Sequence, residues 1–402
     1  MISLKYFLTK MKDVKGRDIA ALLPMTVALI ASPAYKQKYK DAWLICEEPK
    51  EARDNGYWFF RKMCENHPEQ KCVYAINHKS PDYKKVKKLG ETVEYGSFKH
   101  WLYYFCAAYN ISSQKGGKPN AALCSFFELN DIFKNKNVFL QHGVIINDVT
   151  WLYSDKSKIK LFITSAVPET DFIREKFGYP PETIQMVGLA RFDNLHNAKV
   201  KRNRIVIMPT WRYWFNLKSK EQSDLKNDFL HSKYYHAWRS LLEDEEFNHV
   251  IEEHDLEVIF YPHRNMQQHV KDFKRELKSR VKVASWKEYD IQELLKSSAM
   301  MITDYSSVFF DMVYMKKPVL FYQFDLEDFR RGQYESGYFD YAKNAFGKSC
   351  KGLEELRQEF ICMVQNGFQP DEAFLAEHER YFTLFDEKNC ERTYQAIKRI
   401  RS

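Results

Sequence analysis

The chain has 402 residues, enough for two domains of ordinary size, and its composition is that of a globular protein, with 45% hydrophobic and 29% charged residues. Lys and Arg outnumber Asp and Glu by 62 to 54, a net charge of +8. This charge suits an anionic partner, such as a nucleotide, a phosphate polymer, nucleic acid or an anionic membrane face, without choosing among them. The eight cysteines form no CxxC pair and several lie in apolar runs, which argues against a disulfide framework and a zinc site.

The first 40 residues form a distinct segment. A basic stretch precedes a run from Ile19 to Tyr35 that carries no charge. The run is shorter than the roughly 20 residues of a spanning helix, and Pro24 and Pro33 interrupt it. A signal peptide would have its apolar region nearer the start. Two interpretations stay open for residues 19–35: a helix in the core of the first domain, or a segment lying on the inner face of a membrane.

Residues 41–197 alternate between strand-like and helix-like segments. Such alternation implies parallel strands with crossover helices, and therefore an α/β sheet. The predicted strands are Ala42–Cys46, Cys72–Ile76, Thr92–Tyr95, Ala121–Phe127, Val138–Leu140, Leu161–Thr164 and Ile184–Val187, and the helices include Gly56–Asn66, Phe98–Tyr109 and Pro168–Phe177.

After a basic polar stretch around residue 200, the alternation restarts and continues through residues 198–369. Residues 370–402 are predicted to be a helical tail that packs back across the first domain. We therefore expect two doubly wound, Rossmann-like domains with a ligand cleft between them. The second series has predicted strands at Ile205–Met208, Val258–Tyr261, Val281–Ala284, Ala299–Thr303 and Val319–Tyr322, and helices at Tyr234–Leu242, Met266–Lys278, Ile291–Lys296 and Val308–Tyr314.

The first candidate for chemistry follows the predicted strand Val138–Leu140. His142 stands at the carboxyl end of this strand, and Gly143 after it allows a tight turn with positive φ or a close backbone approach. A histidine exposed at such a place can act as a general base near neutral pH. The alternative is a loop histidine that serves only to hydrogen-bond its surroundings.

Two further strands of the second domain end in cationic residues. Thr210 and Arg212 follow Ile205–Met208, and an arginine there can hold a phosphate through two parallel hydrogen bonds. A surface salt bridge would explain the same arginine. His263 and Arg264 follow Val258–Tyr261, where the imidazole can donate to a phosphoryl oxygen and the guanidinium can assist.

The fourth candidate is the cluster Asp304-Tyr-Ser-Ser307 between a strand and a helix. Serine is a favoured N-cap, so helix capping explains one of Ser306 and Ser307. A helix N-terminus also offers free N–H groups and a partial positive charge to an anion. Strand, turn, hydroxyl pair and helix together predict a cradle for a diphosphate.

Standard motifs of other classes are absent from the sequence. It contains no Walker lysine motif, GxGxxG, GxSxG, HExxH, HRD or DFG, and no zinc-finger spacing. It also lacks the DxD motif that holds a metal–diphosphate, so the sequence suggests neither a metal nor a cofactor.

Taken together, these stretches resemble the family of CDP-glycerol glycerophosphotransferases, which build teichoic acids and related polyol-phosphate polymers. The most specific match is TDYSSVFFD followed by KKPVLFY, and FLQHG, PTWR, YPH, ARDNGYWFF and GLARFDNL support it. The resemblance implies a GT-B-type fold with two Rossmann-like lobes. It also implies a CDP-glycerol or CDP-ribitol donor, an acceptor linked to polyprenyl diphosphate, and peripheral binding at the cytoplasmic membrane face.

By motif, His142 resembles the family's general base and His263 the residue that stabilises charge on the diphosphate. Arg212, Asp304, Ser306 and Ser307 match positions near the donor phosphates. Transfer of this kind rests mostly on positioning and charge stabilisation, which such groups can supply. Residues Val144–Asp148 lack the lysine that polymerases of the family often carry there, which leaves the acceptor open.

Two other functions remain as alternatives. One is a GT-B glycosyltransferase that uses a nucleotide sugar in envelope polysaccharide assembly. The other is a catalytically silent protein that binds nucleotides or polyanions through its basic surface; nucleic acid itself is not the expected partner.

Overall fold

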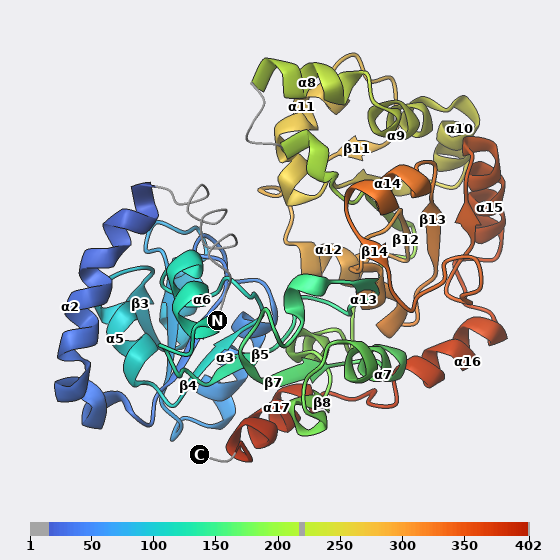
Figure 1. Ribbon diagram of the computed structural model, residues 1–402. Helices are drawn as coiled ribbons and strands as arrows, with labels where there is room; N and C mark the ends of the chain where they lie inside the picture. The colour runs from blue at the N-terminus through green and yellow to red at the C-terminus, as the bar shows by residue number, and fades with distance from the viewer. Residues whose placement is uncertain (1–15, 217–221, 401–402) are drawn as a thin grey trace. The chain divides into compact units, whose positions relative to one another are not determined.

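Two parallel β-sheets organise the chain in the computed structural model, which describes residues 16–216 and 222–400 (Figure 1). Within these residues the first sheet has seven strands in the order β3-β2-β1-β4-β5-β7-β8, and the second has six in the order β11-β10-β9-β12-β13-β15. All strand pairs in both sheets are parallel. In each sheet the strand order reverses beside the first strand of the series, which is the doubly wound arrangement predicted from the sequence.

The described chain divides into two units, each built on one sheet. Unit 1 comprises residues 16–142, 150–194 and 386–400, and unit 2 comprises residues 143–149 and 195–385. The long segments of the two units meet at 194/195, which is close to the predicted domain boundary at 197/198. Two differences concern the ends of the chain: residues 16–40 are an integral part of unit 1, and the predicted tail is shared between the two units.

Unit 1 contains the first sheet and the helices that cover it. Its strands are β1 (Trp43–Cys46), β2 (Cys72–Ile76), β3 (Glu91–Glu94), β4 (Tyr109–Ser112), β5 (Asn137–Phe139), β7 (Ile159–Thr164) and β8 (Ile184–Met186). Its helices are α2 (Gly16–Tyr39), α3 (Asn55–Asn66), α4 (Tyr83–Leu89), α5 (Phe98–Cys106), α6 (Ala121–Leu129), η1 (Thr150–Leu152), α7 (Val167–Lys176), η2 (Pro181–Thr183), η3 (Ala190–Asn194) and α17 (Asn389–Lys398).

Unit 2 contains the second sheet and a short antiparallel pair, β6 with β14. Its strands are β6 (Asn147–Asp148), β9 (Arg204–Met208), β10 (Glu257–Phe260), β11 (Lys282–Val283), β12 (Met300–Thr303), β13 (Val319–Tyr322), β14 (Glu335–Ser336) and β15 (Ser349–Cys350). Its helices are η4 (Tyr213–Asn216), α8 (Gln222–Leu230), α9 (Lys233–Glu243), α10 (Glu245–Glu253), η5 (Arg264–His269), α11 (Val270–Lys274), α12 (Ile291–Ser297), α13 (Phe309–Tyr314), α14 (Leu326–Gly332), α15 (Leu353–Gln365) and α16 (Glu372–Tyr381).

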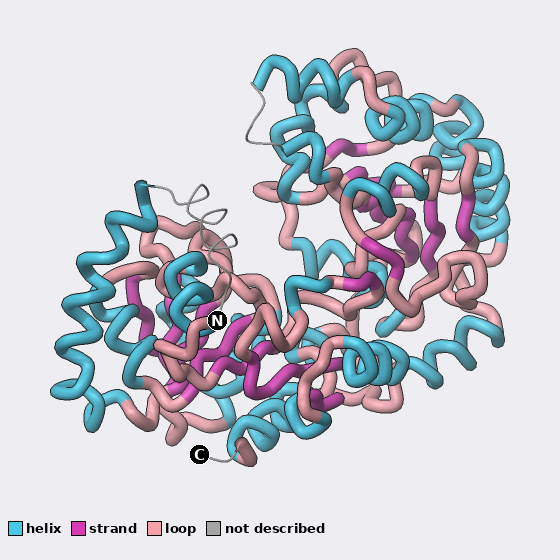
Figure 2. The backbone as a smooth tube through the Cα atoms, in the orientation of Figure 1, coloured by secondary structure: helices cyan, strands magenta, loops and turns pink. Residues whose placement is uncertain are grey.

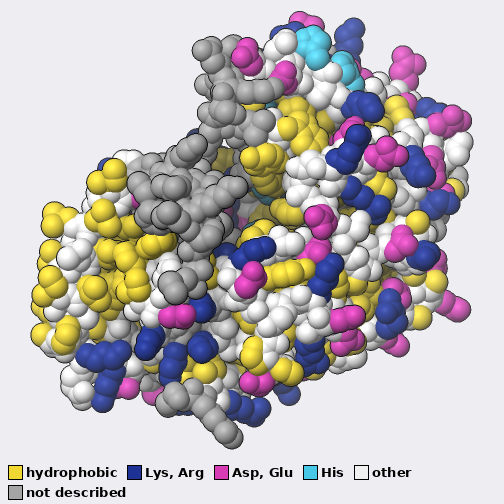
Figure 3. Space-filling model, viewed as in Figure 1, with side chains coloured by type: hydrophobic (Ala, Val, Ile, Leu, Met, Phe, Trp, Pro, Cys, Tyr) yellow, Lys and Arg dark blue, Asp and Glu magenta, His cyan; other side chains and the backbone are white. Residues whose placement is uncertain are grey.

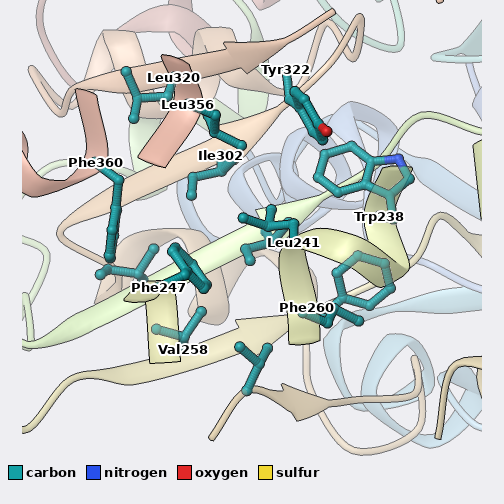
Figure 4. Close-up of a cluster of buried hydrophobic side chains, with 14 of the residues drawn as sticks. Trp238, Leu241, Phe247, Val258, Phe260, Ile302, Leu320, Tyr322, Leu356 and Phe360 are labelled. Carbon is teal, nitrogen blue, oxygen red and sulfur yellow. The ribbon is translucent and has the colours of Figure 1, made fainter. Parts of the chain in front are cut away.

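Both faces of the first sheet are buried, which explains why its strands read as continuous apolar runs. Successive residues of β1 point to opposite faces: Trp43 and Ile45 join a cluster with α3 and α17, whereas Leu44 and Cys46 join a cluster with α2 and α5. Helices lie alongside the strands in each unit (Figure 2). In unit 2, side chains from α9, α10, α15 and the central strands form one core, with Trp238, Phe260 and Phe360 among its largest members (Figure 4).

One predicted strand is wrong. Ala121–Phe127 is the beginning of helix α6, whose N-cap Asn120 accepts a hydrogen bond from the backbone N–H of Leu123 at 3.0 Å. A short apolar run does not distinguish a buried strand from a buried helix by periodicity, and the cap residue carries the distinguishing signal. The strand that belongs at this place in the order is β4 (Tyr109–Ser112), of which the sequence pattern assigned Tyr109 to the preceding helix and left residues 110–112 without an element.

Helix α2 also differs from expectation, because it runs without a break through Pro24 and Pro33. Its buried residues Met25, Ala28 and Tyr39 pack on α5, and the amide of Asn120 donates to Asp18 at 2.8 Å. Its other faces expose a row of apolar side chains, among them Leu23 at 73% and Ile30 at 76%. By length and composition it is the one helix in the described residues that could cross a membrane.

Candidate active site

In unit 1, polar residues gather where β1, β4 and β5 end. The strand order reverses between β1 and β4, and ligands of such sheets bind at the carboxyl ends of the strands beside this point. Glu47 follows β1, Ser113 and Gln114 follow β4, and His142 follows β5 shortly after its end. The positive φ of this last turn falls at Gln141 (65°), whose carbonyl accepts from the amide of Asn55 at 2.7 Å.

His142 pairs with a carboxylate. Its Nδ1 makes a very short hydrogen bond to Oδ2 of Asp54, the residue that caps the N-terminus of α3. The amide nitrogen of Gln114 lies 2.8 Å from the same Nδ1 and 3.3 Å from Asp54 Oδ2. Because a carboxylate only accepts, the proton of the neutral imidazole sits on Nδ1 and Gln114 donates to Asp54.

This tautomer leaves Nε2 of His142 with its lone pair. The side chain is 69% exposed, and Nε2 has no hydrogen-bond partner within the part of the chain that the structure describes. The negative charge of Asp54 raises the pKa of His142 above its ordinary value, although burial of part of the ring opposes the shift. Burial would raise the pKa of Asp54, but the charge and hydrogen bond of His142 and the charge of Arg191 together hold it below its ordinary value.

Arg191 supports the pair from the other side. Its Nη1 donates to the carbonyl of His142 at 2.6 Å and lies 3.3 Å from Oδ1 of Asp54. The backbone N–H of Arg191 donates to the side chain of Asn55 at 2.9 Å. The segments that contain Asp54, His142 and Arg191 are far apart in the sequence, and they meet around one imidazole.

Glu47 fixes the start of α3, on which Asp54 sits. Its carboxylate accepts from the backbone N–H of Gly56 at 2.6 Å and from the hydroxyl of Ser113 at 2.7 Å. A β-carbon at Gly56 would lie 2.7 Å from Cγ of Glu47, so glycine is required for this approach. Burial, and after it the charge of Asp54, raises the pKa of Glu47 to about 7.

In unit 2, the same kind of reversal lies between β9 and β12, and Thr210 and Asp304 meet there. The backbone N–H of Thr210 donates to Oδ1 of Asp304 at 2.7 Å, and the N–H of Tyr305 donates to the same oxygen at 2.7 Å. Two of the predicted site residues are thus brought together at the place that the fold favours for a ligand.

Arg212 lies beneath this point and is fully buried. Its guanidinium donates to Oδ2 of Asp304 at 2.8 Å, to both carboxylate oxygens of Asp325 at 2.9 Å, and to the carbonyl of Thr210 at 2.9 Å. The rings of Tyr234 and Tyr305 lie 4.8 and 5.0 Å from its Cζ. The two carboxylates keep its pKa above the ordinary arginine value despite burial. The geometry gives Arg212 and Asp304 the role of shaping the loops; contact of either with a phosphate stays a prediction.

Ser306 and Ser307 are half-buried and lie just before α13. The N-cap of α13 is Val308, which makes no side-chain cap bond, so the prediction of a serine cap is wrong. Instead, the carbonyls of Ser306 and Ser307 accept from the N–H groups of Phe309 and Phe310 at 3.2 and 3.1 Å. The hydroxyl of Ser307 makes no hydrogen bond to any described residue, and that of Ser306 only a long one, 3.4 Å from the N–H of Val308.

His263 follows β10, next to β9 in the sheet, and begins the turn that leads into η5. Its Nδ1 accepts from the backbone N–H of Asn265 at 3.1 Å, so in the neutral ring the proton is on Nε2. The ring of Trp211 lies roughly parallel to the imidazole, with centroids 6.2 Å apart. Arg264 is exposed as the first residue of η5. The neutral ring of His263 therefore carries its proton on Nε2, whereas that of His142 carries it on Nδ1.

The fold and these strand ends define a class: α/β proteins with two Rossmann-type sheets, each carrying polar groups at its reversal point. The sequence profile described as CDP-Glycerol:Poly(glycerophosphate) glycerophosphotransferase matches residues 28–399. The chain belongs to this family, as its motifs predicted.

Among curated relatives, the minor teichoic acid biosynthesis protein GgaB of Bacillus subtilis (strain 168) is 30% identical over 370 residues, which are 89% of this chain and 40% of GgaB. The teichoic acid poly(glycerol phosphate) polymerase of Bacillus spizizenii is 30% identical over 242 residues, 57% of each chain. The chain thus spans between two fifths and three fifths of the length of these two relatives.

Solved structures confirm the predicted fold class. The wall teichoic acid polymerase TagF superposes with a TM-score of 0.65 at 16% identity, covering 100% of this chain and 99% of that one. A complex of S. aureus MnaA with UDP superposes with a TM-score of 0.54 at 11% identity, covering 90% and 96%.

Several residues of the two clusters were not among the predicted site residues, and the charged ones that pair with predicted residues or support them are Asp54, Arg191, Glu47 and Asp325. Asp54 and Arg191 lie in the motifs ARDNGYWFF and GLARFDNL, which pointed to the family without assigning a role to either side chain. Glu47 and Asp325 follow β1 and β13, so the search for polar residues just after strands, which located His142, could also have found them. The conformation of the loops between strands and helices decides which of these side chains meet.

Proposed function

We propose that the protein transfers glycerol phosphate, or another polyol phosphate, from a CDP-polyol to a hydroxyl of a lipid-linked or polymeric acceptor in teichoic acid or related polymer synthesis. The observation that carries the proposal is the pairing of His142 with Asp54, which leaves Nε2 of an exposed imidazole as a base. Membership of the family supports the choice of donor, and TagF crystals were soaked with CDPG.

In the proposed reaction, Nε2 of His142 takes the proton of the acceptor hydroxyl as its oxygen attacks the β-phosphorus of the donor. The new bond joins that oxygen to phosphorus, the bond between phosphorus and the bridging oxygen breaks, and CMP leaves with the electron pair. Asp54 and Arg191 keep the imidazole oriented. The Nε2–H of His263 and the hydroxyls of Ser306 and Ser307 are proposed to donate to the phosphoryl oxygens, assisted by Arg264.

The test is to incubate the purified protein with CDP-glycerol and CDP-ribitol together and a polyprenyl-diphosphate-linked acceptor. We expect release of CMP and an acceptor whose mass has increased by polyol-phosphate units, which also identifies the donor and the chain length. Release of UDP from UDP-sugars in place of CMP would establish a glycosyltransferase instead.

The base is tested by replacing His142 with alanine. We expect the transfer rate to fall by roughly 10²- to 10⁴-fold, the usual contribution of a general base. His249→Ala is the matched control, because His249 is an exposed histidine on α10 with a distant acidic neighbour, Glu253 at 4.0 Å. Unchanged transfer by a folded His142→Ala protein would point to a different base or to a protein whose role is only to bind.

We also propose that α2 lies on the cytoplasmic face of the membrane, where a lipid-linked acceptor is found. Its exposed apolar residues gather in one region of the surface (Figure 3), and Lys36 and Lys38 lie in its last turn. An apolar face buried at the headgroup level with cations beside it is typical of peripheral membrane helices.

Flotation with phosphatidylglycerol vesicles tests the location. A Leu23→Asp, Ile30→Asp protein should stay with the soluble fraction while the wild type floats, because each aspartate replaces a highly exposed apolar side chain. Leu375→Asp is the control, since Leu375 is an exposed leucine on α16 of unit 2. Equal flotation of all three proteins would rule out this surface.

A further inference from the structure

Unit 2 contains a cavity of about 540 Å³ that no predicted site residue lines. It lies at η4, the start of α9 and helix α14, and its walls combine aromatic rings, hydroxyl and carboxylate groups and two cations. The lining residues are Trp214, Phe215, Ser232, Lys233, Tyr234, Asp325, Asp328, Arg331 and Gly332.

Aromatic rings form part of its walls. Phe215 and Tyr234 are buried, and Trp214 is half-buried. The indole of Trp214 lies against the backbone of Gly332, where a β-carbon would come within 2.5 Å of its six-membered ring. An indole held in this way offers apolar surface to the carbon–hydrogen groups of a ligand.

The cavity has four charged groups, Lys233, Arg331, Asp325 and Asp328, and Asp325 is held by the buried Arg212. Asp328 accepts from Arg331 at 2.8 Å and lies 3.8 Å from the ammonium of Lys233. The two cations are 78% and 75% exposed, so most of their N–H donors face water rather than this single carboxylate. The exposed N–H groups of these two cations, which share one carboxylate, can donate to an anion such as a phosphodiester.

The cavity is connected to the Asp304–Ser307 loop. Asp325 and Tyr234 line the cavity, and both contact Arg212: Asp325 through two hydrogen bonds and Tyr234 through its ring. Arg212 in turn holds Asp304, from which the loop to Ser307 continues. A ligand in the cavity therefore lies one buried ion-pair network away from the serines proposed to hold the donor phosphates.

We infer that this cavity binds a polyol-phosphate segment of the acceptor polymer, an inference that rests on the proposed function. A chain in which phosphodiesters alternate with short polyols matches both kinds of wall. A phosphodiester would accept from Lys233 and Arg331, the polyol carbons would lie on Trp214, and the polyol hydroxyls would reach Asp328 and Ser232.

A second cavity of about 540 Å³, in unit 1, has three arginines in its walls. Two of them already donate to groups of the protein and are therefore less available to a ligand. Arg392 donates to the carbonyl of Val187 at 2.9 Å and to Asp386 at 3.0 Å, and Arg174 reaches the carbonyl of Ile184 at 3.4 Å. These two arginines cover the outer edge of strand β8, which is an ordinary means of protecting an edge strand.

Binding is measured first, by equilibrium dialysis of the protein with a synthetic glycerol-phosphate oligomer and with a neutral glycerol oligomer of equal length. The wild type should bind the phosphate oligomer and not the neutral one. Lys233→Ala, Arg331→Ala should weaken this binding by at least about tenfold, because two charge-assisted contacts are lost, and Trp214→Ala should also weaken it. Lys343→Ala, Arg280→Ala is the control, since both are exposed cations of unit 2 with one acidic partner each.

The second measurement is transfer from CDP-glycerol to the same oligomer. The Lys233→Ala, Arg331→Ala protein should show a KM for the oligomer at least about tenfold higher, with the KM for CDP-glycerol and the release of CMP without acceptor unchanged. Oligomer binding and KM equal to those of the wild type would overturn the cavity assignment and leave the proposed function standing. Specific oligomer binding by a protein that never releases CMP would support the cavity assignment and overturn the proposed function.

Discussion

At the scale of single residues, the pairing of His142 with Asp54 carries the chemical proposal. The carboxylate does two things to the imidazole: it fixes the proton on Nδ1, and it raises the pKa of the ring. A base with a raised pKa accepts a proton more readily, but it is already protonated at a higher pH. The pairing therefore has a consequence for the pH dependence of the reaction.

For the wild type we expect the transfer rate to fall on the acid side with an apparent pKa above about 6.5, the ordinary value for histidine. In Asp54→Asn the negative charge is gone, so this acid limb should move to lower pH. The maximal rate should drop by about 10- to 100-fold, because the orientation of the ring is weakened. A pH–rate profile of both proteins checks this; an acid limb that does not move would exclude Asp54 as the partner of the titrating group.

Arg212 shows what a search for polar residues just after strands could and could not predict. This search located Arg212 correctly at the end of a strand of the second sheet, beside the reversal of strand order. It could not give the direction of the side chain, which depends on Asp304 and Asp325 converging from loops about 90 and 110 residues further along the chain. A buried guanidinium paired with two carboxylates was one of several arrangements compatible with the same sequence.

Because the ion pairs of Arg212 are fully buried, loss of one partner should be costly. Arg212→Met leaves two buried carboxylates without their cation, which typically costs about 3–5 kcal/mol. For a unit of this size, that corresponds to a fall in Tm of roughly 10 °C. Differential scanning calorimetry measures it, with Arg280→Met, an exposed arginine, as the control. A shift of less than about 2 °C would mean that the network contributes little to folding.

At the scale of elements, most strands and helices follow from periodicity, and the errors in the first sheet share one cause. The strands of the first sheet are buried on both faces, so they lack the alternation that marks a half-buried strand. Without it, the apolar start of α6 resembled a strand, and β4 was not predicted. The cap residues Asn120 and Ser97 mark both helix starts in the structure, each by accepting from a backbone N–H three residues on.

The start of α3 is the element on which Asp54 depends, and Gly56 allows it to approach Glu47. Gly56→Ala would place a methyl group 2.7 Å from Glu47 Cγ, so the helix or the carboxylate must move. We expect a loss of about 1–3 kcal/mol in stability, typical of overpacking, together with a lower transfer rate. Gly352→Ala is the matched control, since a β-carbon there meets nothing within 4 Å. Two proteins of equal Tm and equal activity would show that this contact is unimportant.

At the scale of the whole molecule, the sequence predicted two doubly wound sheets because the alternation of elements stops and restarts near residue 200. It predicted a helical tail on the first domain, but not that only the last part of the tail belongs there. Residues of α16 belong to unit 2, whereas α17 belongs to the core of unit 1, with Tyr394 5.5 Å from Trp43 and the N–H groups of Asn389 and Cys390 bound to Asp193. These contacts join residues about 200 to 350 positions apart, beyond the reach of any local pattern.

This division predicts that the two units respond separately to core mutations. Ile397 of α17 is fully buried in unit 1, and Phe360 of α15 is fully buried in unit 2. Replacing either with alanine should cost about 2–5 kcal/mol through the lost burial and the cavity that remains. Since local unfolding follows cooperative units, Ile397→Ala should speed hydrogen exchange in β1, β2 and β4 and leave β9, β10 and β12 protected, and Phe360→Ala should do the reverse. Hydrogen-exchange mass spectrometry of the full chain resolves both sets, and a uniform loss of protection in either variant would show that the two sheets unfold as one.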